Sequence, residues 1–119
     1  MHFQVINDIY YVGILEKIKH NIPEFTSLFD EEDGIYPILG ELGTFIIENI
    51  DNQNIFDDCI HFINDAIENG GNETEDVIVL QIFQKMYETS FIASKIRECF
   101  SEKVKVIFDR YQAEYNRIS

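Results

Sequence analysis

Residues 54–68, NIFDDCIHFINDAIE, decide the fold because their apolar residues recur with the 3.6-residue period of an α-helix. The apolar positions take up most of the helix circumference: Ile55, Phe56, Cys59, Ile60, Phe62, Ile63, Ala66 and Ile67. The narrow remaining face is polar and carries Asp57, His61, Asn64, Asp65 and Glu68. This pattern predicts a central helix that is packed on most sides and shows one acidic edge to solvent.

Similar patterns predict helices before the central one. The first helix ends at His20 and starts at Phe3 or Asn7. Proline favours the first turn of a helix, so Pro23 predicts a short second helix. The apolar residues of that second helix would be Phe25, Leu28 and Phe29.

The charged loop DEEDG, residues 30–34, leads to a third helix that starts near Pro37. Gly40 and Gly43 lie three residues apart inside that helix. Either they let a neighbouring helix come close, or they mark a kink. The expected buried stripe of the third helix is Leu39, Leu42, Phe45, Ile46 and Ile50.

The ends of the central helix carry candidate caps. Asn54 is the expected N-cap, and Gly70 and Gly71 are expected to end the helix in the left-handed conformation. Asn72 or Thr74 then caps a fifth helix. The expected core face of the fifth helix is Val77, Val79 or Leu80, Ile82, Phe83, Met86 and Tyr87.

Two more helices complete the predicted fold. Thr89 or Ser90 caps the sixth, and Ser101 caps the last. The sequence therefore predicts an all-α fold: a single helical domain over residues 1–119, with about six or seven short helices packed as antiparallel hairpins.

Composition favours a folded globule, since 45% of the 119 residues are hydrophobic and 13% are aromatic. Cys59 and Cys99 fall on apolar helical faces, which predicts two buried, reduced thiols. No apolar run approaches the length of a membrane span, and the first residues lack the features of a secretory signal. We therefore expect a cytoplasmic protein, most simply a monomer.

The charge is distributed very unevenly. The chain has a formal net charge of −13, while residues 20–84 hold fifteen Asp or Glu and no Lys or Arg. A field of one sign attracts a cationic partner and speeds its association. It disfavours nucleic acid and anionic membranes as partners. The alternative is that the acidity merely keeps the protein dissolved.

No pattern in the chain predicts catalysis or a cofactor. Asp57, His61 and Asp65 have the i, i+4, i+8 spacing of possible metal ligands, but no HExxH or CxxC pattern supplies another ligand. A solvated polar face explains these three residues better. We expect no enzyme activity, no metal and no cofactor.

Four segments together resemble a known group of proteins: LEKIKHNIPEF (15–25), GELGTFIIENI (40–50), FDDCIHFINDAIENGGNETEDVIVL (56–80) and KIRECFSEKVKVIFDRY (95–111). Their helix order and hydrophobic pattern resemble small, acidic, all-helical bacterial proteins of the immunity-protein type. Such proteins pair with polymorphic or contact-dependent growth-inhibition toxins. The resemblance implies a protein that binds and neutralises a cognate toxin.

Immunity proteins of this kind often present carboxylates where a basic nuclease toxin expects phosphate, which fits the acidic segment. The expected partner-binding residues are Asp57, Asp58, His61, Asp65, Glu68, Glu73, Glu75 and Asp76, with a second patch at Asp30, Glu31, Glu32, Asp33 and Tyr36. Tyrosine at a surface often anchors an interface, which is why Tyr36 is included. The alternative function is a helical adaptor or structural domain with an unrelated protein partner.

Overall fold

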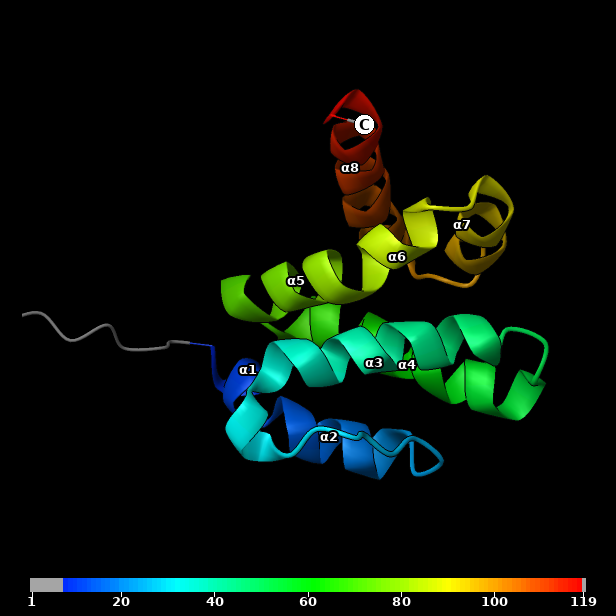
Figure 1. Cartoon of the computed structure of the whole chain (residues 1–119). Helices are drawn as coiled ribbons and strands as arrows, with labels where there is room; N and C mark the ends of the chain where they lie inside the picture. Colours follow the sequence, from blue (N-terminus) through cyan, green and yellow to red (C-terminus); the bar gives the residue numbers. More distant parts are fainter. Residues whose placement is uncertain (1–7, 119) are drawn as a thin grey trace, which may run out of the picture.

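The computed structural model describes residues 8–118, and every regular element in that range is helical (Figure 1). The elements are α1 Ile9–Val12, α2 Ile14–Asn21, the 3₁₀ turn η1 Glu31–Asp33, α3 Ile35–Glu48, α4 Gln53–Asn69, α5 Asn72–Ile78, the π turn η2 Val79–Phe83, α6 Gln84–Tyr87, α7 Ser90–Arg97 and α8 Glu102–Ile118. The predicted all-α, single-domain fold is confirmed. No helix within residues 8–118 has the length and apolar content to cross a bilayer.

Helix α4 is the central helix that the sequence predicts. Helices α2, α5 and α8 all pack against it. Its buried residues are Phe56, Cys59, Ile60, Phe62, Ile63, Ala66 and Ile67. Its exposed edge carries Asp57, His61 and Glu68. The wide apolar stripe is therefore buried against neighbouring helices on most sides of α4, as the sequence predicts.

Helix α5, the π turn and α6 form one continuous helical rod. The residues at both junctions, from Ile78 to Val79 and from Phe83 to Gln84, keep right-handed helical angles. A π turn inserts extra backbone into the helix and shifts its register. As a result Val79 is buried and Leu80 is exposed, which decides between the two candidates for the core face.

The rod meets α3 at Gly43. A Cβ atom on Gly43 would lie 2.8 Å from the carbonyl oxygen of Gln81 and 3.3 Å from the Cα of Ile82. Both of these atoms belong to the backbone of the π turn, which has little room to move away. Gly43 therefore allows the close approach of a neighbouring helix, the first of the two roles considered for this glycine.

The start of the described chain is tied to its middle by Asp8, which is 5% exposed. One carboxylate oxygen accepts a hydrogen bond from the amide of Tyr11 at 3.0 Å, and the other accepts one from the amide of Thr74 at 2.7 Å. Asp8 thus caps the N-terminal ends of both α1 and α5. Burial by itself would raise the pKa of the Asp8 carboxyl, but these amide hydrogen bonds outweigh it and hold the pKa below its ordinary value.

The predicted second helix at Pro23 is wrong. Residues 23–30, which we call the strap, contain no helix. Helices α2 and α3 run in the same direction in Figure 1, so the strap has to travel back along their length. Extended chain covers about 3.3 Å per residue against 1.5 Å in a helix, so a short connection of this kind must be extended.

Two expected caps of the central helix are also wrong. Helix α4 begins at Gln53, so its N-cap is Asn52 and not Asn54. Gly70 and Gly71 end the helix in extended conformations, with φ of −85° and −104°, and not in the left-handed one. Gly70 is needed for space, because its Cβ would lie 2.5 Å from the carbonyl oxygen of Ala66.

Other boundaries differ in smaller ways. The predicted first helix is divided into α1 and α2 at Gly13, and its possible start at Phe3 lies outside the described residues. Helix α5 begins at Asn72 with Gly71 as its N-cap, because the Asp8 carboxylate already supplies the cap. The predicted start of the last helix after Ser101 is confirmed.

An aromatic cluster joins the end of the π turn, α6 and α8 to the turn that follows α7. The rings of Phe83 and Phe108 are 5.0 Å apart in an edge-to-face arrangement, and Phe100 packs against both. The hydroxyl of Tyr87 donates a hydrogen bond to the carbonyl oxygen of Phe108 at 2.7 Å.

Next to this cluster, Cys99 is exposed, which corrects the prediction that it is buried. It follows the end of α7, where the helical period no longer applies.

We expect Gly43→Ala to lower the free energy of unfolding by about 1–3 kcal/mol, because the added methyl collides with backbone atoms of the π turn. Without the collision, alanine would stabilise a helix interior by about 1 kcal/mol. Gly40→Ala is the control. Its Cβ would meet only the side-chain atoms of Gln81 and Lys85, which move easily. Urea unfolding of both variants measures the difference, and equal stabilities would contradict the close-approach role.

We expect Asp8→Ala to lower the free energy of unfolding by about 1–3 kcal/mol, because it leaves two amides at helix N-termini without their acceptor. Asp76→Ala removes an exposed carboxylate from the same helix α5 and serves as the control. The folded pKa of Asp8 is lowered, so its contribution is present above about pH 3.8 and is lost as the pH falls through the folded pKa. The difference between wild type and Asp8→Ala in urea unfolding should therefore shrink in acid, and a constant difference would argue against the charged cap.

Candidate interaction surface

The acidic edge of α4 is the first part of the predicted surface. Asp57, His61 and Glu68 are exposed along it, as the helical spacing requires. Asp58 is half-buried beside Cys59. Burial, followed by the charges of Asp58 and Glu24, raises the pKa of the Cys59 thiol to about 12. Glu24, in the first residues of the strap, therefore lies on the side of α4 that carries the buried Cys59, which at about 100° per residue is opposite the edge formed by Asp57, His61 and Glu68.

Two of the predicted partner-binding residues are used inside the fold. The hydroxyl of Tyr10 donates a 2.8 Å hydrogen bond to Asp65, joining α1 to α4. The hydroxyl of Tyr111 donates a 2.9 Å hydrogen bond to Glu75, joining α8 to α5, and Arg110 lies 3.4 Å from the same carboxylate oxygen. Asp65 and Glu75 are therefore less available to a partner than the exposed acids.

A second group of predicted residues meets where α3 and α5 begin. Burial and the charge of Asp76 raise the pKa of Tyr36. Burial, then the neighbouring Tyr36 and the charge of Glu73, raise the pKa of Tyr11. The structure thus brings Tyr36 close to acids that are about forty residues away along the chain. Tyr36 itself is half-buried and not fully at the surface.

The DEEDG corner is the third part. The amide of Asp30 donates a 3.0 Å hydrogen bond to Asp33, and Gly34 ends the corner with a φ of 97°, which favours glycine. Glu31 forms an ion pair with Lys19 at 3.6 Å. The carboxylates of Asp30 and Glu32 stay exposed with no ion pair among residues 8–118.

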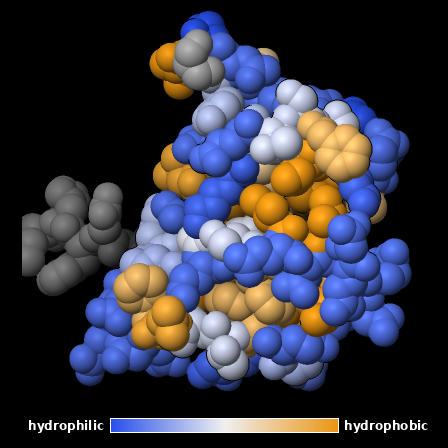
Figure 2. Space-filling view, turned by 45° about the vertical axis from the view of Figure 1, so that its right-hand side comes forward, coloured by the Kyte–Doolittle hydropathy of each residue, from blue (hydrophilic) through white to orange (hydrophobic). Residues whose placement is uncertain are grey.

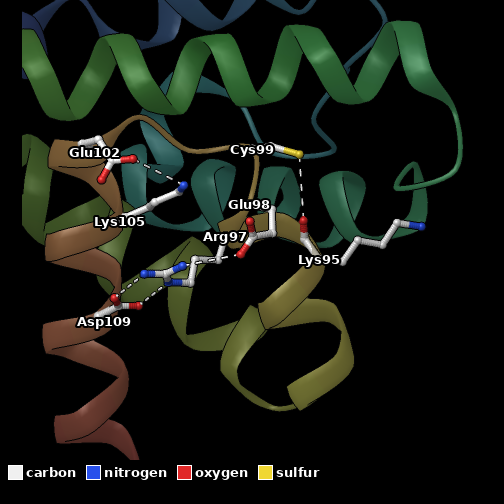
Figure 3. Close-up of polar contacts among 7 residues, drawn as sticks. All are labelled: Lys95, Arg97, Glu98, Cys99, Glu102, Lys105 and Asp109. Atoms are coloured by element: carbon white, nitrogen blue, oxygen red, sulfur yellow. Dashed lines mark hydrogen bonds and ion pairs between the residues drawn. The ribbon is translucent and has the colours of Figure 1, made fainter.

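Few of the acids are neutralised by bases. Within residues 8–118, the ion pairs that involve the fifteen acids of residues 20–84 are those of Glu31, Asp51 and Glu75. Three bases of the C-terminal helices, Arg97, Lys105 and Arg117, pair with acids of the same helices. Figure 3 shows Arg97, which donates to both carboxylate oxygens of Asp109 at 2.8 and 2.9 Å. In the same view Lys105 pairs with Glu102. The negative field of residues 20–84 is therefore left largely uncompensated.

Sequence reasoning missed the exposed apolar side chains. Figure 2, which brings the right-hand side of Figure 1 forward, shows apolar side chains in separate areas, one at the height of α6 and α7 and another lower down. Large apolar side chains that are exposed are Ile9, Val12, Leu28, Phe29, Leu80, Phe91, Val106 and Ile118. The sequence predicts Leu28 and Phe29 in a helix that does not form, so no signal in the helical pattern reveals their exposure.

The acids do not gather as metal ligands. Among residues 8–118, no three His, Cys, Asp or Glu side chains lie close enough together to hold a metal ion. What the arrangement offers is a set of exposed carboxylates, which accept charge-assisted hydrogen bonds from guanidinium and ammonium groups.

One family model, described as "Domain of unknown function (DUF7674)", matches residues 15–116. The match includes the strap, the acidic edge of α4 and the start of α5. No curated protein and no solved structure matches the chain.

We expect Asp76→Asn to lower the pKa of Tyr36 toward its ordinary value, because it removes one of the two causes of the shift. The pKa should stay somewhat raised, since burial remains. Titration of the tyrosine ring carbons by NMR measures it. Glu68→Gln removes the same charge from α4 and should leave Tyr36 unchanged. An equal effect of both variants would mean that Tyr36 senses the overall field and not Asp76.

Proposed function

Because the chain belongs to the DUF7674 family of domains of unknown function, we propose its role from its surface: it binds a cationic protein partner, and it acts as an immunity protein that neutralises a bacterial toxin. The single observation that supports binding is the run of fifteen acids without a Lys or Arg over residues 20–84. In the fold most of these carboxylates have no ion pair within residues 8–118.

Such a surface acts on a partner in two ways. At a distance, its field steers a positively charged protein toward it and raises the association rate. In contact, exposed carboxylates such as Asp57 and Glu68 accept charge-assisted hydrogen bonds from Arg and Lys. A cost accompanies this arrangement, because uncompensated like charges repel one another within the fold. Retaining them is more easily understood if a partner neutralises them.

The toxin-neutralising part of the proposal comes from the resemblance to immunity proteins. A nuclease-type toxin has a basic surface for the phosphates of its substrate. Carboxylates on a binding protein can occupy the same basic groups. The proposed partner is therefore a toxin domain with a positive surface.

A second candidate function is a helical adaptor. The exposed apolar side chains, including Phe91 and Leu80, support it, because exposed apolar areas often mark contacts with other proteins. An adaptor of this kind would bind its partner without depending on the acidic segment.

The test is co-purification with the tagged product of the adjacent upstream gene, followed by affinity measurements at low and high ionic strength. We expect a tight complex that high salt weakens. Charge reversal on the α4 edge, with Asp57→Lys and Glu68→Lys together, should slow association by about tenfold or more.

The control reverses the same number of charges outside the acidic segment, with Glu88→Lys and Glu114→Lys, which are also exposed. These changes should have a much smaller effect on association. If the partner is absent from the complex at low salt, the proposal fails. If it binds with no dependence on salt or on the α4 edge, the adaptor function is favoured.

A further inference from the structure

The strap presents two apolar side chains to solvent. Leu28 is 95% exposed and Phe29 is 43% exposed, and they are adjacent in the chain. The acidic corner at residues 30–33 follows them directly. A scattered single apolar residue on a surface needs no explanation, but an adjacent pair inside an acidic segment is unusual.

The strap holds these side chains outward through side-chain hydrogen bonds. The Glu41 carboxylate of α3 accepts a hydrogen bond from the amide of Leu28 at 3.0 Å and another from the hydroxyl of Ser27. That hydroxyl oxygen accepts a 3.0 Å hydrogen bond from the amide of Phe29. On the other side, Phe25 packs edge-to-face on Phe45 of α3, with 5.3 Å between ring centroids. The strap is thus fastened to α3 while Leu28 stays free.

Two surface pockets lie on either side of the strap. One of about 510 Å³ separates it from α2, and its apolar lining includes Leu15, Ile18 and Ile38. The other, of about 480 Å³, separates it from α3 and α6, and Glu41, Glu48 and Lys85 reach its wall. Phe25 and Phe29 line both pockets. The strap is therefore a ridge with a mainly apolar pocket on one side and a mixed one on the other.

The charge around the ridge selects the kind of partner. Glu24, Asp30 and Glu32 are exposed acids on or next to the strap with no ion pair among residues 8–118. Lys19 at the pocket rim is already paired with Glu16 and Glu31, both at 3.6 Å. The amine of Lys85 donates hydrogen bonds to the carbonyl oxygen of Gly40 and to Thr44. The bases near the ridge are thus engaged, and the exposed charge is negative.

We propose that the strap, with Leu28 and Phe29 at its crest and the pocket against α2 beside it, is the docking surface for a cationic protein segment that carries an apolar side chain between its Lys or Arg residues. The partner's apolar side chain would enter the pocket, and its basic residues would face Glu24, Asp30 and Glu32. The inference rests on the proposed function, for which it supplies the contact surface.

The two parts of the surface then have different roles. The exposed acids of the strap and of the α4 edge mainly set the association rate. The apolar crest excludes water in the complex and sets the dissociation rate, as central apolar residues do in interfaces. A second copy of this chain is a poor occupant, because a net charge of −13 on each copy opposes their association.

The test uses two synthetic peptides of equal length and equal positive charge. One alternates Lys with Leu on one helical face, and the other has Ser in place of Leu. We expect the Leu peptide to bind more tightly and to shift the NMR signals of the strap and of Ile18 and Ile38. Leu28→Ser and Phe29→Ser should each lower the affinity for the Leu peptide by about tenfold and leave the affinity for the Ser peptide unchanged.

Matched controls are Phe91→Ser, which is 73% exposed on α7, and Leu80→Ser, whose exposure is close to that of Phe29. Neither should change peptide binding, and circular dichroism checks that all four variants are folded. Equal binding of both peptides, or signals shifted away from the strap, would overturn the inference and leave the proposed function standing. If neither peptide binds at low salt, the inference fails, whereas the proposed function fails only if the co-purification finds no partner at low salt. Dimerisation that Leu28→Ser abolishes, seen by sedimentation, would instead identify a second copy as the occupant.

Glu41 is a positioning residue in this proposal. Glu41→Ala should speed hydrogen exchange at the Leu28 and Phe29 amides by about tenfold or more, because the Leu28 amide loses its acceptor and the Ser27 hydroxyl, which accepts from the Phe29 amide, is no longer held by α3. The same substitution should also lower the affinity for the Leu peptide. The control is Glu48→Ala, which removes the same charge from α3. Glu48 lines the same pocket as Glu41, but its loss should leave the hydrogen exchange of the two amides unchanged. If the two variants behave alike in both measurements, the fastening by Glu41 has no part in binding.

Discussion

The close approach of α3 to the π turn constrains much of the rest of the structure. With no side chain at Gly43, the two backbones touch, and this contact fixes where α3 lies relative to the long rod of α5, η2 and α6. Helix α3 in turn carries Tyr36 at its start and Glu41 in its middle. The helix that makes this close contact therefore also holds the strap, through Glu41, and brings Tyr36 near the charge of Asp76 in α5. Small residues at a helix contact commonly have such consequences, because packed interiors transmit displacement.

The acidic residues divide into those that hold the fold together and those that face solvent. Asp8, Asp65 and Glu75 each accept hydrogen bonds from another element, at positions where a carboxylate replaces missing backbone partners or holds a tyrosine hydroxyl. Among residues 8–118, exposed acids such as Asp57, Glu68 and Glu32 accept no hydrogen bond from another element, although Glu31 of the DEEDG corner pairs with Lys19 and Asp33 accepts a hydrogen bond within the corner. A chain this acidic can therefore stabilise itself with some of its carboxylates and still keep a strongly negative surface, and charge alone does not separate the two groups.

The periodic parts of the chain could be predicted from the sequence, and the non-periodic parts could not. The stripe from Phe56 to Ile67 determines α4, because burial on most sides demands that pattern. The strap was predicted as a helix from Pro23 and three apolar residues, yet its course depends on α2 and α3 running in the same direction, which is a long-range property. Likewise, a carboxylate such as Asp8 finds its second amide 66 residues away, and local spacing contains no information about that partner. For the same reason, the acidic segment was apparent from the sequence, whereas the apolar crest within it was not.

The two cysteines have opposite surroundings, and this difference makes the protein easy to label. Cys59 is fully buried in α4 with a thiol pKa near 12, so it holds its proton and stays out of reach of reagents in the native state. Cys99 is exposed after α7, where its sulfur faces the carbonyl oxygen of Lys95 (Figure 3). Cys99 belongs to neither the strap nor the acidic edge of α4. A fluorophore attached through maleimide chemistry would therefore go to one known position and report on complexes by the slowing of molecular tumbling, without any engineered attachment point.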